Sequence, residues 1–155
     1  MCLESLILMA RCLSKEENQI HTLGTLLAAG EDKSWKVRLS FAKNFGAFAD
    51  SFGKEITDNN LIQTFTLLLN DNEFEVKLAA INNISTCIHN ISVEKIINLV
   101  LPTLQNVYPE GNALFRAGTA TALCEMSSEV GRETTMSKIL PILKDLIADE
   151  NSEVK

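Results

Sequence analysis

The sequence repeats with a period of 39 residues, and this period limits the possible folds more than any other feature. A polar, turn-like string ending in an apolar and a basic residue occurs four times, each 39 residues after the last, at 32–38, 71–77, 110–116 and 149–155. Apolar columns follow the same step, as Phe45, Ile84 and Leu123 do. A period in the range of roughly 20 to 50 residues is typical of stacked supersecondary units rather than one central core.

Each period contains two helical patterns. Apolar residues such as Ala42, Phe45, Ala49 and Phe52 are spaced three and four positions apart, which is the spacing of a helix face. Seven Gly and three Pro also leave few turns for a β fold. We expect first helices near 17–29, 57–69, 95–107 and 135–147, and second helices near 34–51, 73–90 and 112–129, after an unpaired second helix at 1–13.

A helical hairpin repeated every 39 residues fits the HEAT class better than the shorter tetratricopeptide or ankyrin units. The predicted fold is all-α, an α–α superhelix that stacks antiparallel hairpins in a right-handed solenoid. The expected units are 1–14, 15–53, 54–92, 93–131 and 132–155. Because the first and last are incomplete, we expect a segment of a longer stack, whose exposed end repeats promote self-association through Leu3, Leu6, Met9, Ile139, Leu143 and Leu146.

Four further columns predict local structure. Gly53 and Gly131 suit the ends of second helices, where a left-handed residue is needed. Pro102 and Pro141 should bend the first helices. Four basic residues recur at one position of the repeat, and four acidic residues recur at another. This pattern favours structural ion pairs between repeats, worth ~0–1 kcal/mol each. These two columns are Arg38, Lys77, Arg116 and Lys155, and Asp32, Asp71, Glu110 and Asp149.

Composition and spacing argue against several function classes. The net charge is −6 and no run of Lys or Arg is present, which disfavours nucleic-acid binding. No apolar run approaches the ~20 residues that span a bilayer. His21 and His89 lack metal-ligand spacing, and no phosphate loop or nucleophile motif is found, so we expect no enzyme, metal or cofactor. Four cysteines without CxxC spacing favour a reducing compartment, the cytoplasm and also the nucleus.

The first turn carries a family resemblance. Residues 31–38 read EDKSWKVR, 42–45 read AKNF, 53–57 read GKEIT, and 137–149 read SKILPILKDLIAD. These segments closely resemble the HEAT-repeat scaffold (A) subunits of protein phosphatase 2A. The resemblance implies a non-enzymatic scaffold, here its middle repeats, whose turns bind the regulatory (B-type) and catalytic subunits. A regulatory-subunit surface is the favoured assignment, and the alternative is a HEAT adaptor of another system such as nuclear transport.

The same resemblance assigns partner contacts to the turns. In the first turn they are Lys33, Trp35, Lys36 and Arg38; in the second, Glu73 and Phe74 match in type, as do Asp71 and Lys77. Trp35 has a competing interpretation, packing against the adjacent repeat, although Trp and Arg are common at interface hot spots. The third turn, 108–114, adds Pro109 and lacks the usual Asp, so we assign no contact to it.

Overall fold

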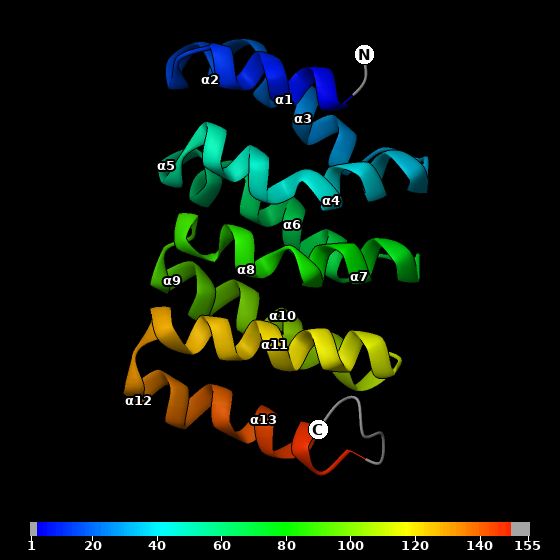
Figure 1. Ribbon diagram of the computed structural model, residues 1–155, viewed down its shortest axis with the longest axis vertical. Helices are drawn as coiled ribbons and strands as arrows, with labels where there is room; N and C mark the ends of the chain where they lie inside the picture. Colours follow the sequence, from blue (N-terminus) through cyan, green and yellow to red (C-terminus); the bar gives the residue numbers. More distant parts are fainter. Residues whose placement is uncertain (1–2, 150–155) are drawn as a thin grey trace.

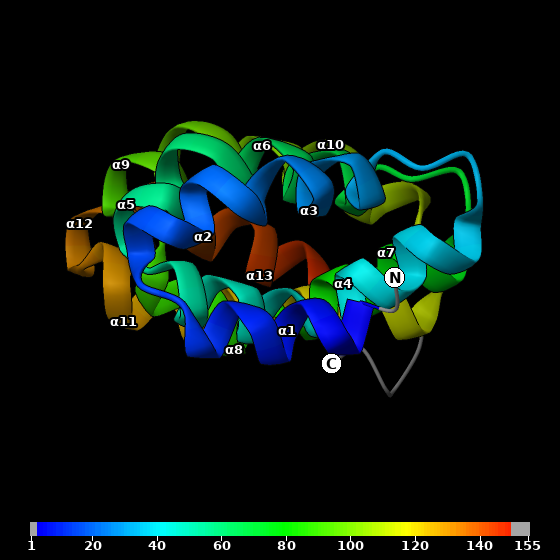
Figure 2. The ribbon, with the colours of Figure 1, turned by 90° about the horizontal axis from the view of Figure 1, so that it is seen from above.

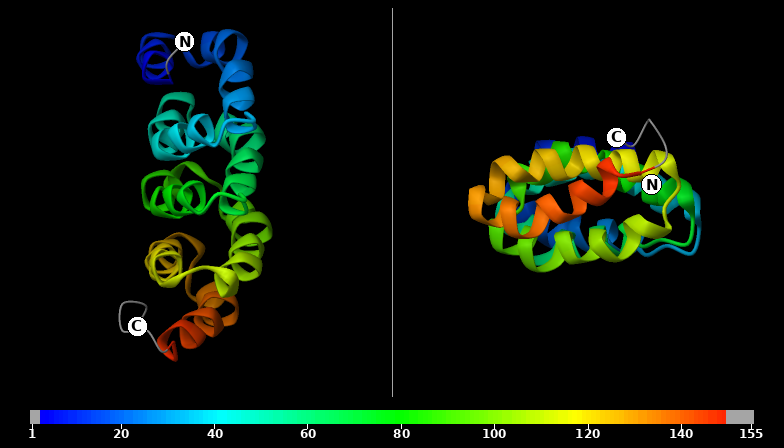
Figure 3. Two further views of the ribbon diagram at one scale, coloured as in Figure 1. Left: turned by 90° about the vertical axis from the view of Figure 1, so that its right-hand side faces the viewer. Right: turned by 90° about the horizontal axis from the view of Figure 1, so that it is seen from below.

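The structure is a computed structural model that describes residues 3–149, and every regular element in that range is a helix. The helices stack along one axis (Figure 1). Two layers are visible from the side, with the first helices of the hairpins in one and the second helices in the other (Figure 3). The expected all-α helical repeat solenoid is therefore confirmed, while its right-handedness and the repeat boundaries stay predictions.

The helices have the following bounds. The second-helix layer contains α1 (Leu3–Cys12), α4 (Trp35–Phe52), α7 (Phe74–Asn82), α8 (Ile84–Cys87), η2 (Ile88–Asn90) and α11 (Ala113–Val130). The first-helix layer contains α2 (Lys15–His21), α3 (Leu23–Gly30), α5 (Lys54–Ile56), η1 (Thr57–Leu61), α6 (Ile62–Leu69), α9 (Val93–Lys95), η3 (Ile96–Val100), α10 (Leu101–Val107), α12 (Arg132–Thr134), η5 (Thr135–Ile139) and α13 (Leu140–Ile147). A short 3-10 turn, η4 (Tyr108–Glu110), precedes α11.

The first helices are not uniform α-helices. Three of them contain a five-residue π-helical stretch in the same phase: η1, η3 and η5. Pro102 and Pro141 are the second residues after η3 and η5, but Gln63 has the same place after η1. We expected Pro102 and Pro141 to bend the first helices. Because η1 forms without a proline, proline is not required for the wide turn. No helix within residues 3–149 is long and apolar enough to cross a membrane.

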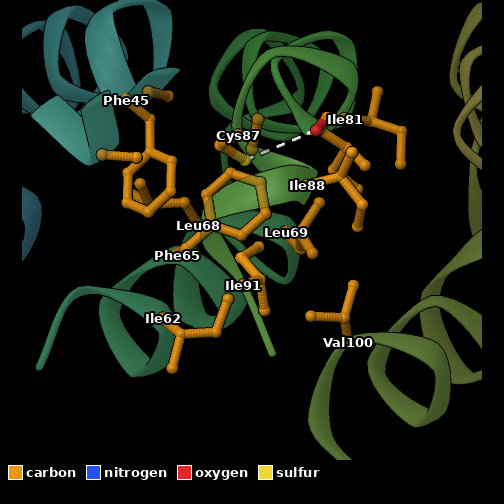
Figure 4. Close-up of a cluster of buried hydrophobic side chains, with 14 of the residues drawn as sticks. Phe45, Ile62, Phe65, Leu68, Leu69, Ile81, Cys87, Ile88, Ile91 and Val100 are labelled. Carbon is orange, nitrogen blue, oxygen red and sulfur yellow. Dashed lines mark hydrogen bonds between the residues drawn. The ribbon is translucent and has the colours of Figure 1, made fainter. Parts of the chain in front are cut away.

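The core lies between the two layers and consists of apolar columns from neighbouring hairpins. In Figure 4, Phe45 of α4 faces Phe65 of α6, and their ring centroids are 4.4 Å apart in a stacked arrangement. Cys87 lies in the same cluster, fully buried, and its Sγ donates to the carbonyl oxygen of Ile84 at 3.5 Å. The prediction that Cys87 acts as a small core residue is confirmed.

The two glycines expected at helix ends have the predicted backbone. Gly53 and Gly131 follow the second helices α4 and α11 and have φ of 83° and 81°. This left-handed region is costly for residues with a Cβ. Each glycine lets the chain reverse into the next first helix.

The prediction of exposed end faces is partly wrong. Leu6, Ile139 and Leu146 are buried, and Leu3 and Leu143 are half-buried, because their side chains pack into the interlayer core. Of the six residues, Met9 alone is exposed, at 43%. The other large apolar side chains that are exposed near the ends of the described stack are Leu8, Ile20, Met136 and Ile147.

Candidate functional site

The loops that join a first helix to its second helix lie along one side of the stack. We call the residues 31–38, 70–77 and 108–116 the turn ridge. In Figure 2 the connecting loops lie beside one another at the same end of the two layers. The ridge therefore brings together segments that are one period apart in sequence.

The first two turns share one local design. In each, an aspartate accepts a hydrogen bond from the amide two residues later: Asp32 Oδ1 from Ser34 N at 2.8 Å, and Asp71 Oδ1 from Glu73 N at 2.9 Å. This aspartate turn satisfies an amide just before the following helix begins. The turns consequently present Trp35 and Phe74 as the first residues of α4 and α7.

The third turn is built differently, as its sequence suggested. Tyr108–Glu110 forms a 3-10 turn, and the N-cap of α11 is Asn112, whose Oδ1 accepts from Phe115 N at 3.0 Å. Gly111 is held close to the ring of Phe115, where a Cβ would meet Cδ1. The third turn, which has Glu110 in place of the usual Asp, therefore also differs from the first two in its backbone shape.

An arginine joins the first turn to the second. Arg38 Nε and Nη2 donate to the two carboxylate oxygens of Asp71 at 2.7 and 3.0 Å. Nη1 of the same side chain donates to the carbonyl oxygens of Asp32 at 2.7 Å and Lys33 at 3.2 Å. The exposed fractions of the two side chains are 18% for Arg38 and 7% for Asp71. We call this bidentate pair with its carbonyl contact the arginine clamp.

A second clamp occurs two periods later. Arg116 Nε and Nη2 donate to Asp149 at 2.6 and 3.3 Å, and Nη1 donates to the carbonyl of Gly111 at 2.6 Å. The predicted structural ion pairs are thus confirmed at two junctions. Within residues 3–149, the intervening members of the columns, Lys77 and Glu110, form no ion pair with each other, so that step of the prediction is wrong. The last basic member, Lys155, lies outside the described residues.

The clamp shifts the pKa of both partners. Burial disfavours the charge on Asp71, but hydrogen bonds from Arg38 and from the Glu73 amide outweigh it, and the pKa of Asp71 is lowered. The hydrogen bond to Asp71 raises the pKa of Arg38. Both groups are therefore held in their charged forms by each other.

The residues predicted to contact a partner fall into two groups. Lys33, Lys36 and Glu73 are exposed, whereas Trp35, Phe74 and Arg38 are half-buried. Lys36 Nζ lies 5.9 Å from the centroid of the Trp35 ring, within cation–π range. Phe74 packs against the core, and Arg38 is held by Asp71. Their role in partner binding stays a prediction.

Sequence reasoning missed a shallow groove beside the ridge, between α4 and α7. It is lined by Leu39, Lys43, Glu75, Leu78, Ala79, Asn82 and Asn83. A signal was present in the sequence, because Leu39 and Leu78 form an apolar column one period apart yet are only half-buried. The groove extends the candidate surface from the turns onto the helices.

Contacts at the opposite end of the same helices were also missed. Asp50 Oδ1 lies 3.2 Å from His89 Nε2 and accepts a hydrogen bond from Asn90 Nδ2 at 2.7 Å. All three side chains lie at the ends of second helices and link neighbouring hairpins. Throughout the described residues, no three His, Cys, Asp or Glu side chains form a group suited to a metal ion.

Comparison with known proteins yields one relative of interest. No protein-family model matches the chain. The chain is 30% identical over 115 residues to the beta isoform of the human serine/threonine-protein phosphatase 2A 65 kDa regulatory A subunit. The matched region covers 72% of this chain and 19% of that protein, so the chain spans about a fifth of its relative's length. This similarity supports a related HEAT-repeat scaffold, and a relative named as a regulatory subunit fits a non-enzymatic chain.

Proposed function

We propose that the chain acts as part of a non-enzymatic scaffold of a protein phosphatase 2A complex, and that its turn ridge binds a regulatory (B-type) subunit. Partial similarity to the 65 kDa regulatory subunit supports the complex, and the geometry of the first two turns supports the surface. The catalytic subunit would bind the same scaffold. The chain itself supplies shape and contacts, with no chemical step.

The observation that carries the proposal is the pair of aromatic residues fixed by the first clamp. Trp35 and Phe74 begin α4 and α7, one period apart, and both are half-buried. The Arg38–Asp71 pair joins the turns that hold them. Rigid, half-exposed aromatic residues contribute large contact areas at low entropic cost, and Trp and Arg are enriched among interface hot spots.

The charged residues of these turns suit recognition rather than core formation. Lys33 and Lys36 are exposed on the first turn, and Glu73 is exposed on the second. Exposed charges of this kind mainly orient a partner and speed its association. We therefore assign affinity to Trp35 and Phe74 and orientation to the charged residues.

A binding assay with purified components tests the proposal. The full chain is immobilised and exposed to purified B-type regulatory subunits, and Trp35→Ala is compared with the parent chain. We expect binding of the parent and at least about tenfold weaker binding of Trp35→Ala. The matched control is Leu67→Ala, which removes an exposed apolar side chain from α6, outside the ridge.

Circular dichroism of both variants separates binding from folding. Loss of helical signal in Trp35→Ala would assign Trp35 to packing. Failure of the folded parent chain to bind any regulatory or catalytic phosphatase subunit, together with capture of basic nuclear-import cargo, would contradict the scaffold proposal and favour the adaptor alternative.

A further inference from the structure

The junctions between successive hairpins are not equally tied. We call the junction between 15–52 and 54–90 the first junction, that between 54–90 and 93–130 the second, and that between 93–130 and 132–149 the third. At the turn end, the first junction has the Arg38–Asp71 clamp and the third has the Arg116–Asp149 clamp. The third also has a hydrogen bond of 3.2 Å from the Tyr108 hydroxyl to Asp145.

The second junction has no such tie at its turn end. The positions that correspond to the clamp residues carry Lys77 and Glu110, and the described side chains place no ion pair or hydrogen bond between them. A polar contact lies at the opposite end of this junction, where Asp58 Oδ1 accepts at 2.7 Å from the amide of Ser92, the N-cap residue of α9. Between the two ends the contact is apolar and close, since a Cβ on Gly118 would lie 3.0 Å from Cγ2 of Ile81.

The chemistry of the two basic side chains explains the difference. A guanidinium is planar and donates in several fixed directions, so Arg38 can hold both oxygens of a carboxylate and its own turn's carbonyl at once. The ammonium of Lys77 is a point charge on a flexible stem and cannot reproduce that fork. Glu110 is also one methylene longer than Asp71 and follows Pro109 in a 3-10 turn.

We propose that the second junction is a hinge in the solenoid. The turn ends of hairpins 54–90 and 93–130 move apart and together, and the Asp58–Ser92 contact is the pivot of this motion. The two hairpins that flank the first junction move as one rigid body, and so do the two segments that flank the third. The ridge then consists of two rigid segments, one with the turns at 31–34 and 70–73 and the other beginning with the turn at 108–112. This property follows from the junctions themselves and holds whatever binds the ridge.

Distance distributions between spin labels test the hinge. Positions 36, 75 and 114 are one period apart, exposed and outside the clamps, so Lys36→Cys with Glu75→Cys spans the first junction. Glu75→Cys with Leu114→Cys spans the second in matched geometry. Cys2, Cys12 and Cys124 are replaced by Ser, and Cys87 stays because it is fully buried. We expect a broader distribution across the second junction than across the first.

Two variants test the cause. Lys77→Arg combined with Glu110→Asp places the clamp residues at the second junction, and we expect its distribution to narrow towards that of the first. Arg38→Lys should broaden the distribution across the first junction and leave the second unchanged. Equal widths across both junctions in the parent chain would overturn the hinge. A first junction that stays narrow in Arg38→Lys would show that the clamp does not set its rigidity, even where the double variant fails to fold.

Discussion

Arg38 bonds both carboxylate oxygens of Asp71, a residue 33 positions later in the chain, and at the same time bonds the backbone of its own turn. The side chain therefore fixes both the shape of its own turn and the distance from that turn to the next. In a solenoid each unit contacts only its neighbours, so such a local tie sets the geometry of the surface that the units share. The aromatic residues Trp35 and Phe74 inherit their relative positions from it.

Removal of the clamp should cost measurable stability. Arg38→Ala leaves the largely buried carboxylate of Asp71 without its charged donor, and hydrogen bonds to charged groups contribute more than neutral ones. We expect the free energy of unfolding to fall by about 1–3 kcal/mol in urea denaturation. Lys33→Ala, which removes an exposed cation from the same turn, should change it by less than about 0.5 kcal/mol. Equal losses in the two variants would contradict a structural role for the clamp.

The clamp should also make stability depend on acid pH. The pKa of Asp71 is lowered in the folded chain, so its carboxylate stabilises the fold at pH values above the unfolded pKa of about 4. That contribution is lost as the pH falls below about 4 and through the folded pKa. We expect the stability difference between the parent chain and Asp71→Asn to shrink as denaturation is repeated from pH 6 down to about pH 3.

The control for this pH series is Glu129→Gln, which changes an exposed carboxylate on α11 that takes part in no ion pair of the described structure. Its difference from the parent chain should be small at every pH. A constant gap between the parent and Asp71→Asn across the series would mean that the Asp71 carboxylate does not titrate with folding.

The helical pairs were predictable because their apolar columns recur with one period and one spacing. The same columns predicted the buried positions of Phe45 and Cys87, and the phase of Gly53 and Gly131 predicted the left-handed helix ends. These features depend on residue type and local spacing, which a single sequence contains. The clamp was also within reach, since Arg38 and Asp71 lie in two aligned columns.

Other features depend on helix rotation and side-chain geometry, which a column of aligned residues does not show. Leu6 and Leu146 were expected on exposed end faces but are buried, because the rotation of each helix turns them towards the interlayer core. Lys77 and Glu110 have the charges of a clamp without its fork geometry, so charge sign alone overpredicted ion pairs. The π-helical stretches share one phase, yet at none of their five positions is the same amino acid present in η1, η3 and η5.

The stacked rings of Phe45 and Phe65 should dominate the stability of the interlayer core. Phe65 is fully buried and its ring lies 4.4 Å from that of Phe45, centroid to centroid. Phe65→Ala should lower the free energy of unfolding by about 3–5 kcal/mol, because it removes buried area and leaves a cavity. Phe65→Leu should cost less, and Leu67→Ala, which alters a side chain that is 59% exposed on the same helix, should have little effect. Urea denaturation of the three variants measures the order.

Cys87 should report on opening of the core through its chemical reactivity. Its side chain is fully buried, and burial raises the pKa of its thiol to about 12. The reactive species is the thiolate, so at pH 8 the buried Cys87 thiol stays protonated in the folded chain. Cys12 and Cys124 are free and exposed.

We expect iodoacetamide at pH 8 to modify Cys12 and Cys124 in the native chain and to modify Cys87 only when denaturant is added, as peptide mass spectrometry would show. The rate at Cys87 should rise in Phe65→Ala, whose weakened core opens more often, and stay unchanged in Leu67→Ala. Modification of native Cys87 at the rate of the exposed cysteines would contradict the packing shown in Figure 4.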